Sequence, residues 1–531
     1  MNDDPQQAAA RPGLGNSDIQ TPPQTVGGIL RRLGPGLIIA ASIVGSGELI
    51  ATTKTGAEAG FTLLWLILLG CVVKVFAQIE IGRYTITEGR TAIEGLNQLP
   101  GPRLRVNWLV WYWVFMFCCG IGQLGGIVGV VGQSLAIPMP FTSDWNHLIQ
   151  QQREYDERVT DFAATLRNAE PQLDDRALKA RVVEELGARP DQQSHYTYDD
   201  AYWSGIVTVI TAVMLVLGRY RLVQNVSVVL VAGFTLVSIV NLFALQWHPN
   251  WRIGWDDIVD GLRMQLPPAS GDRTPVATAL AAFGIIGVGA SELIYYPYWC
   301  LEKGYARWTG PCEQTESWAQ RAHGWLRVMR WDAVCSLIVY TFATLAFYLT
   351  GAAVLHRANR IPSDEQLVPA LLEMYVPVFN QAAEWILLFG VFTVLYSTFF
   401  VSTASNSRAA SDAIRVYRLG GSTDKDARWR TRVLCALLPF ISLTIYVVNK
   451  NPVTLVLISG MSQAVMLPML GAAALYFRYQ RCDRRIMPTR LWDVMLWLSF
   501  LALLTTGIWG VTSQGLKMYN RFAPLEAVEA P

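Results

Sequence analysis

"VGSGELI" at residues 44–50 and "VGASELI" at residues 288–294 are two nearly identical heptapeptides in opposite halves of the chain. Each lies inside an apolar run and carries one glutamate, Glu48 in the first copy and Glu292 in the second. An ionisable side chain inside a bilayer costs at least about 2.5 kcal/mol and marks a functional site by default. Two glutamates at matched positions therefore predict one site, built from both halves of the chain.

The composition around these copies is typical of a membrane protein. Of the 531 residues, 52% are hydrophobic and 16% are charged, whereas soluble domains carry about 25% charged residues. A net charge of +2 argues against a nucleic-acid partner. The eight cysteines form no CxxC pair and indicate neither a disulfide framework nor a zinc site. No nucleophile motif, metal triad or phosphate loop stands out, so we do not expect an enzyme.

Apolar runs of about 20 residues, each long enough to cross a bilayer core, recur along the chain. They predict an all-α polytopic membrane protein with about eleven spans, near residues 35–56, 61–87, 107–136, 203–219, 222–246, 276–302, 330–355, 378–407, 431–449, 453–478 and 491–514. Residues 1–32 are polar and predict a disordered cytoplasmic tail. Charged residues 138–200 predict a helical insertion outside the membrane, for which a solvated decoration is the simpler interpretation.

Basic residues predict how the chain crosses the membrane. Arginines and lysines are frequent in alternate short loops, such as 303–330 and 408–430, and sparse in the others. Because cytoplasmic loops are enriched in these residues, we expect a multi-pass protein of the plasma (inner) membrane. Its amino terminus would be cytoplasmic and its carboxyl terminus outside. The oligomeric state is open, with a monomer favoured.

The two heptapeptides fall in spans one and six, an odd number of crossings apart, so they run through the membrane in opposite senses. This is the arrangement of a transporter built from two inverted five-span repeats, in which the first helix of each repeat is broken near the midplane. We assign residues 33–246 and 247–478 to the repeats, and residues 479–531 to an eleventh span and a tail. The glycines at 45–47 and 287–289 suit such breaks.

A broken helix frees carbonyl groups, roughly from Ser42 to Gly45 and from residue 286 to residue 289. Free carbonyls are tolerated inside a membrane only where a cavity or an ion satisfies them. Together with a carboxylate from each side they would form a cation site, with Glu48 and Glu292 supplying the charge. Ser46 and Ser291 add hydroxyls. Gln463 lines the site from span ten or serves a structural role; the sequence leaves both open.

Three stretches resemble the Nramp family of divalent metal transporters. They are "GPGLIIAASIVGSGELIATTKTGAEAGFTLLW" (34–65), "FGIIGVGASELIYY" (283–296) and "MLPMLGAAAL" (466–475). Asp332 also lies where the seventh span of that family commonly begins with Asp. The resemblance covers the membrane core from about 33 to 515 and implies a LeuT-like fold with a transported metal ion as the partner.

The signature motifs of that family are altered here. Its Asp-Pro-Gly-Asn falls on residues 45–48, so the metal-binding Asp and Asn are replaced by Gly45 and Glu48. Its Met-Pro-His falls on residues 290–292, so the Met and His are replaced by Ala290 and Glu292. The resemblance further places two carbonyl ligands on Ser42 and Gly287, and two acids linked to proton movement on Gln123 and Gly126.

These replacements change which metal ions the site is expected to prefer. A thioether favours softer metals, whereas carboxylate, carbonyl and water suit Mg²⁺ and Mn²⁺. The sequence therefore predicts a transporter of a hard divalent cation, with weak or no proton coupling and no resident cofactor. One alternative is a transporter of another small solute, such as an organic cation, that uses Glu48 and Glu292 as counter-charges or proton sites. A second is a receptor centred on 138–200.

Two further segments carry expectations. Lys74 lies within span two, and a lysine at that depth is a functional candidate that would otherwise pair with a carboxylate such as Glu80. The basic, amphipathic stretch "WAQRAHGWLRVMRW" (318–331) predicts a helix lying in the membrane interface.

Overall fold

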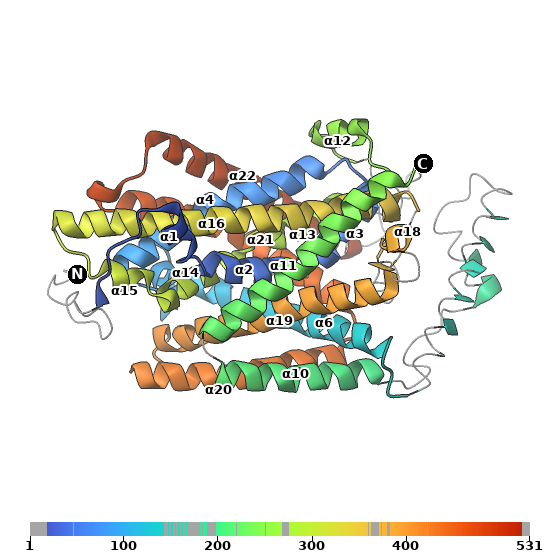
Figure 1. Cartoon of the computed structure of the whole chain (residues 1–531), viewed down its shortest axis with the longest axis horizontal. Coiled ribbons are helices and arrows are strands. Elements are labelled where there is room, and N and C mark those ends of the chain that lie inside the picture. The colour runs from blue at the N-terminus through green and yellow to red at the C-terminus, as the bar shows by residue number, and fades with distance from the viewer. Residues whose placement is uncertain are drawn as a thin grey trace.

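A computed structural model shows the chain as a bundle of helices that run mostly along one axis (Figure 1). It describes residues 18–142, 198–267, 275–362 and 371–522, apart from residues 46, 219, 250, 359, 373, 380–382 and 422, together with scattered residues of 147–187. Most of the 138–200 insertion lies outside the described residues, as do residues 1–17 of the predicted tail.

The first half of the chain supplies the first broken span and the four spans that follow it. Its elements are α1 (Val26–Leu30), α2 (Pro35–Ile43), the π-helical turn η3 (Gly47–Thr52), α3 (Thr53–Ala59), α4 (Leu64–Glu88), α5 (Ala92–Asn97), β1 (Arg103–Leu104), β2 (Val106–Asn107), α6 (Trp108–Ala136), α10 (Asp199–Leu217), α11 (Tyr220–Ala244), η4 (Leu245–Trp247) and α12 (Trp255–Leu262). The two strands form a short antiparallel hairpin between α5 and α6.

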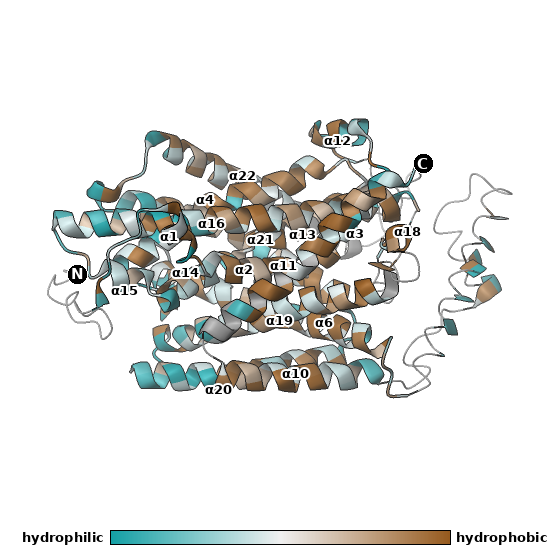
Figure 2. Ribbon diagram, viewed as in Figure 1, coloured by the Kyte–Doolittle hydropathy of each residue, from teal (hydrophilic) through white to brown (hydrophobic). Residues whose placement is uncertain are grey.

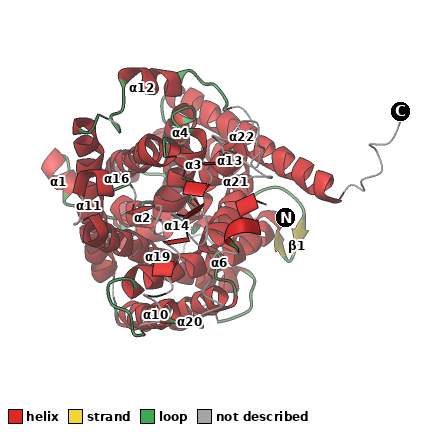
Figure 3. Cartoon of the chain, turned by 90° about the vertical axis from the view of Figure 1, so that its right-hand side faces the viewer, coloured by secondary structure: helices red, strands yellow, loops and turns green. Residues whose placement is uncertain are grey.

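The second half begins with the other broken span. Its elements are α13 (Pro275–Ile285), α14 (Ala290–Lys303), α15 (Tyr305–Thr309), α16 (Glu316–Thr350), η5 (Gly351–His356), α18 (Val376–Phe379), α19 (Ala383–Val416), α20 (Asp424–Val448), α21 (Pro452–Tyr476), η7 (Phe477–Arg481), η8 (Arg484–Ile486) and α22 (Arg490–Phe522). Seen from one end of the bundle, α2 and α14 lie near its centre, and α10, α20 and α22 lie on its outside (Figure 3).

The number of spans agrees with the prediction. In the described part of the chain, ten helices are long and apolar enough to cross a membrane, and the pair Pro35–Ile43 and Gly47–Ala59, bent by 41°, makes an eleventh. Apolar residues dominate the middle of the bundle, and hydrophilic residues gather toward its ends (Figure 2). The assignment of the spans to repeats at residues 33–246 and 247–478 stays a prediction.

Close packing around α6 explains another glycine-rich stretch, at residues 125–132. A side chain at Gly125 would meet the backbone of α20, and one at Gly132 would meet the backbone of α10. Small residues at such positions let membrane helices approach closely. Consistent with this, α6 packs against α10, α20 and α21.

Two sequence predictions at one end of the bundle are corrected. The tail is ordered from Asp18 onward: the backbone of Gln20 donates to the Trp308 carbonyl at 3.1 Å and accepts from the Trp325 indole at 3.0 Å. Residues 318–331 do not form a separate interfacial helix but the first turns of α16. Trp318 and Trp325 are fully buried, whereas Trp331 is exposed. Trp325 packs against Trp308 of α15 and donates to the tail, and Arg485 lies over the ring of Trp318.

Candidate functional site

The break in span one lies between α2 and η3. A side chain on Gly45 would lie 1.7 Å from the hydroxyl oxygen of Thr398 on α19, so only glycine fits at this contact. In a continuous helix the Gly45 N–H would bond to the Ala41 carbonyl four residues earlier. Here that carbonyl accepts from the Ser397 and Thr398 hydroxyls, each at 3.3 Å. Hydroxyls of α19 thus satisfy the freed carbonyl.

The break in span six lies between α13 and α14. Gly287 has φ +61, a left-handed conformation that glycine adopts without strain. In a continuous helix its N–H would bond to the Phe283 carbonyl. That carbonyl instead accepts from the ammonium of Lys74 on α4, which also donates to the Ile286 carbonyl at 2.6 Å. A buried lysine therefore satisfies freed carbonyls at this break.

Glu48 joins the two breaks. Its carboxylate is fully buried and accepts from the Gly45 N–H at 3.4 Å and from the Gly287 N–H at 3.2 Å. Both N–H groups lie at the breaks, where the partner of a continuous helix is lost. The Thr344 hydroxyl on α16 lies 3.2 Å from the same carboxylate. One side chain therefore satisfies a freed donor in each broken span.

Glu292 has a different environment. It lies in the first turn of α14, half-buried, and accepts from the Ser42 hydroxyl at 3.0 Å. Ser42 lies 2.8 Å from the hydroxyl of Ser402 on α19. Since Ser42 donates to the carboxylate, Ser402 donates to Ser42, and a chain of two hydroxyls ends on Glu292. Within the described residues, no lysine, arginine or histidine nitrogen forms an ion pair with this carboxylate.

A small polar cavity of about 30 Å³ lies beside Glu292, enough for about one water molecule or a bare ion. Its wall comes from α2, α6, α14, α19 and α21, and consists of Ser42, Gly120, Gln123, Leu124, Ile127, Ser291, Glu292, Tyr295, Thr398, Ser402, Asn406 and Gln463. These side chains offer carboxylate, hydroxyl and amide oxygens but neither sulfur nor imidazole. Oxygen donors of this kind suit hard cations.

Gln463 fixes the amide side of this cavity. Its carbonyl oxygen accepts from the Ser291 N–H at 3.1 Å, near the start of α14, where a helix has unpaired N–H groups. Its amide nitrogen lies 3.3 Å from both Gln123 and Ser459. The same residue therefore caps α14 and lines the cavity, and its part in binding a cation stays a prediction.

The structure brings together four of the residues expected from the sequence and separates the others from them. Ser42, Ser291, Glu292 and Gln463 line one cavity, whereas Glu48, Gly45 and Gly287 form the hydrogen-bonded junction between the breaks. The expectation that both carboxylates face one pocket does not match this geometry, because donors of both breaks hold Glu48. Ser46 lies outside the described residues. No group of three His, Cys, Asp or Glu suited to a metal occurs in the described part of the chain.

Sequence reasoning missed the contribution of α19. Thr398, Ser402 and Asn406 are spaced four residues apart, so they lie on one face of the helix and line the cavity together. The signal was present as an unusual run of small polar residues, "YSTFFVSTASNS" (396–407), inside an apolar span. Asn406 also accepts from the Tyr295 hydroxyl of α14 at 2.6 Å.

The predicted partner of Lys74 is corrected as well. Glu80 pairs with Arg83 at 3.1 Å and accepts from the Trp492 indole of α22 at 2.5 Å. Lys74 instead bonds to the two carbonyls of span six, and its ammonium lies 4.6 Å from the centre of the Phe283 ring. Helical spacing explains this, because residues six apart lie on different faces.

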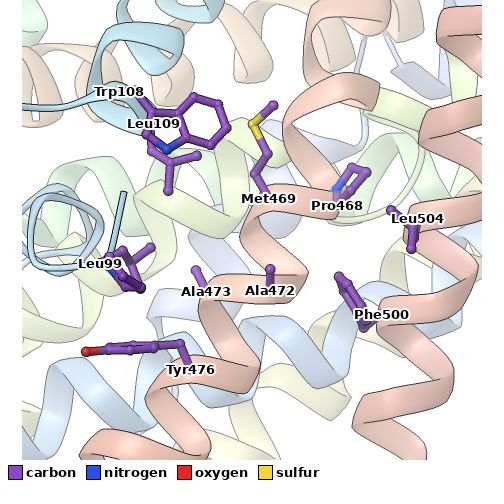
Figure 4. Close-up of a pocket in the computed structure, with 11 residues that line it drawn as sticks. Leu99, Trp108, Leu109, Pro468, Met469, Ala472, Ala473, Tyr476, Phe500 and Leu504 are labelled. Carbon is purple, nitrogen blue, oxygen red and sulfur yellow. The ribbon is translucent and has the colours of Figure 1, made fainter. Parts of the chain in front are cut away.

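A larger cavity of about 430 Å³ lies elsewhere, between α6, α21 and α22. Figure 4 shows its wall of Leu99, Trp108, Leu109, Met469, Phe500 and Leu504, with Tyr476 at one side. No charged side chain lines it, so it suits hydrocarbon and not a cation.

Comparison with known families decides which family this architecture represents. The family model described as natural resistance-associated macrophage protein-like, Nramp, matches residues 196–513, more than half of the chain. The chain belongs to the Nramp family. This match begins just before α10 and does not include the first three spans. No curated protein matches the sequence.

Solved structures similar to this Nramp protein share its fold. A histidine-to-alanine variant of the Eremococcus coleocola manganese transporter has a TM-score of 0.64 at 16% identity, covering 97% of this chain and 93% of its own. The same transporter with an aromatic bis-isothiourea substituted compound has a TM-score of 0.62 at 15% identity, with 96% and 92% covered. MhsT in complex with L-phenylalanine has a TM-score of 0.51 at 13% identity, with 92% and 100% covered. The LeuT-like, all-α fold predicted from the sequence is confirmed.

Proposed function

We propose that this Nramp protein moves a hard divalent cation, Mg²⁺ or Mn²⁺, across the plasma membrane by alternating access. The observation that carries the proposal is Glu292, a carboxylate that forms no ion pair within the described residues and lies beside a small cavity with many polar side chains in its wall. A cation entering the cavity would balance this charge and bind hard oxygen ligands. Membership of the Nramp family and likeness to a structure named as a manganese transporter support the same cargo.

Glu292 is the proposed anionic ligand, with Ser42, Ser291 and Gln463 as neutral oxygen ligands or as partners of bound water. The carbonyls of Ser42 and Gly287 are further candidates. Glu48 stays a predicted second ligand, but its carboxylate would first have to leave the three donors that hold it. Gly45 leaves space for the close approach of α19, and only its backbone could contribute a ligand.

Proton coupling is proposed to be weak or absent. The polar side chain that α6 contributes to the cavity is Gln123, whose amide oxygen accepts from Ser459 at 2.7 Å and does not titrate. Transport would then follow the membrane potential, since two charges moving inward across 100 mV gain about 4.6 kcal/mol. The predicted topology, with a cytoplasmic amino terminus, an outer carboxyl terminus and a monomeric transporter, belongs to the same proposal.

Flux into proteoliposomes tests this function. We expect the purified protein to carry Mg²⁺ or Mn²⁺ down an imposed negative-inside potential, with little change in a trapped pH dye. A protein that moves neither ion in either orientation of the potential would refute the proposal. Acidification of the lumen in proportion to the metal transported would refute passive transport but not metal transport itself.

An alternative cargo, a small organic solute, is favoured by the fold shared with MhsT, which was solved with L-phenylalanine. The volume of the cavity argues against it, because about 30 Å³ is far below the roughly 300 Å³ of sites for organic ligands. Competition separates the two cargoes: Mn²⁺ flux inhibited by Mg²⁺ but not by a panel of organic cations supports the metal.

A further inference from the structure

Lys74 is the basic side chain whose ammonium donates to the carbonyls at the break in span six. It is fully buried on α4, and its ammonium donates to the carbonyls of Phe283 and Ile286. These carbonyls end α13, where a helix has no backbone partner for them. An ammonium carries three donors and no acceptor, so carbonyl oxygens are suitable partners for it.

The same peptide group links Lys74 to Glu48. The Ile286 carbonyl accepts from Lys74 at 2.6 Å, and the N–H on the other side of that peptide bond, at Gly287, donates to Glu48 at 3.2 Å. A positive and a negative charge thus flank one peptide and polarise it in the same sense, which strengthens both hydrogen bonds. Neither buried charge is left without a compensating group.

The two breaks differ in how their carbonyls are satisfied. In span one, the Ala41 and Val44 carbonyls accept from neutral hydroxyls, with Thr398 at 3.3 Å and 3.5 Å. In span six, a full positive charge takes this place. Lys74 accounts for this difference. Its side chain extends to the break from α4, a helix that packs directly against α14.

We infer that Lys74 is a tethered cation that holds the freed carbonyls of the break in span six, as a bound cation could. Lys74 holds the unwound segment against Glu48 and so positions α14, whose first turn presents Glu292 to the cavity; the importance of this for transport rests on the proposed function. Lys74 is a positioning residue, because it does not line that cavity. Transport would then require no second cation at this position.

Chemical rescue tests the inference. Lys74→Ala removes three carbons and the ammonium, which n-propylammonium can supply in solution. We expect Mn²⁺ flux in liposomes to fall at least tenfold in the variant, and to recover at least threefold, with saturation, when propylammonium is added on both sides. Tetramethylammonium, which has no N–H donor, and neutral 1-propanol should restore nothing.

The controls fix the interpretation. Propylammonium should not change the flux of the wild type. The Lys54→Ala variant, which changes a lysine of α3 paired with Glu58 at 4.0 Å, should transport at the wild-type rate. A Lys74→Ala variant that transports at the wild-type rate, or a folded one that propylammonium does not restore, would overturn the inference.

Stability measurements cover the case in which Lys74→Ala does not fold or the wild type moves no divalent cation. Lys74→Met and Glu48→Gln each leave one buried charge uncompensated, so each should lower the melting temperature in detergent. The double variant should melt above Lys74→Met. If the losses of melting temperature in the two single variants simply add in the double variant, the proposed link between the charges is wrong. If the wild type transports no divalent cation but the double variant melts above Lys74→Met, the proposed cargo is wrong and the link between the charges stands.

Discussion

At the level of single residues, hydrogen bonding separates the two glutamates of the repeated heptapeptide. Glu48 accepts from two backbone N–H groups and lies within reach of one hydroxyl, so its lone pairs are engaged. Glu292 accepts from Ser42 and faces a cavity. A carboxylate has about four lone-pair sites, and the Ser42 hydroxyl engages one of those of Glu292 on the cavity side. We therefore assign charge balance to Glu292 and structural cohesion to Glu48.

Replacing each glutamate by glutamine should separate these roles. Glu292→Gln is expected to lower Mn²⁺ affinity at least tenfold in titration calorimetry and to leave the melting temperature nearly unchanged. Glu48→Gln is expected to destabilise the protein by about 2 kcal/mol, since hydrogen bonds to charged groups contribute about 1.5–3 kcal/mol. Glu316→Gln, an exposed change at the start of α16, is the matched control.

The division of roles would be wrong if both changes abolished binding while leaving stability unaltered. The sequence could locate both glutamates but not distinguish them, because the two heptapeptides are nearly the same. Their partners, Thr344 for one and Ser42 for the other, come from other elements. Only the folded arrangement decides which carboxylate is enclosed.

At the level of elements, the central feature is a pair of broken helices whose freed backbone groups are satisfied by other helices. In α2 the acceptors meet hydroxyls of α19, and in α13 they meet Lys74 of α4. The glycines made both breaks predictable from the sequence. The groups that satisfy the freed backbone could not be predicted from the sequence, because they depend on which helices become neighbours. The true start of α16 was missed for the same reason.

A methyl group at Gly45 should disrupt the first break. Gly45→Ala would place a Cβ atom 1.7 Å from Thr398 Oγ1, and we expect a loss of about 3 kcal/mol, at the upper end of overpacking costs. Gly205→Ala on α10 is the control, since nothing lies within 4 Å of a Cβ there. Thermal unfolding in detergent should show a lower melting temperature for the first variant only. Equal melting temperatures would contradict the close approach of α2 to α19.

At the level of the whole molecule, the predicted topology can be tested with one native thiol. Cys312 is exposed in the segment between α15 and α16, on the side predicted to be cytoplasmic. Partial burial raises the pKa of this thiol to about 11, and Glu88 and Asp483 act in the same direction. Because the thiolate is the reactive form, labelling by a maleimide should be slow at pH 7 and accelerate about tenfold per pH unit up to pH 9.

A membrane-impermeant maleimide should therefore label Cys312 in inside-out vesicles and not in intact cells, with Cys312→Ser as the control. Labelling of Cys312 in intact cells would reverse the topology. The bundle and its number of spans followed from apolar run length alone, whereas sidedness rests on the distribution of basic residues. Neither the fold nor its likeness to other structures determines it.

The central claim is that a hard cation binds beside Glu292 between the two broken spans. Anomalous X-ray scattering from crystals soaked in Mn²⁺ tests it most directly. We expect one strong peak in the cavity formed by Ser42, Glu292 and Gln463, about 2 Å from a carboxylate oxygen of Glu292 if the ion binds directly, and no peak there in Glu292→Gln. Strong density bound by Glu48 alone, or Mn²⁺ density in the cavity that persists in Glu292→Gln, would contradict the claim.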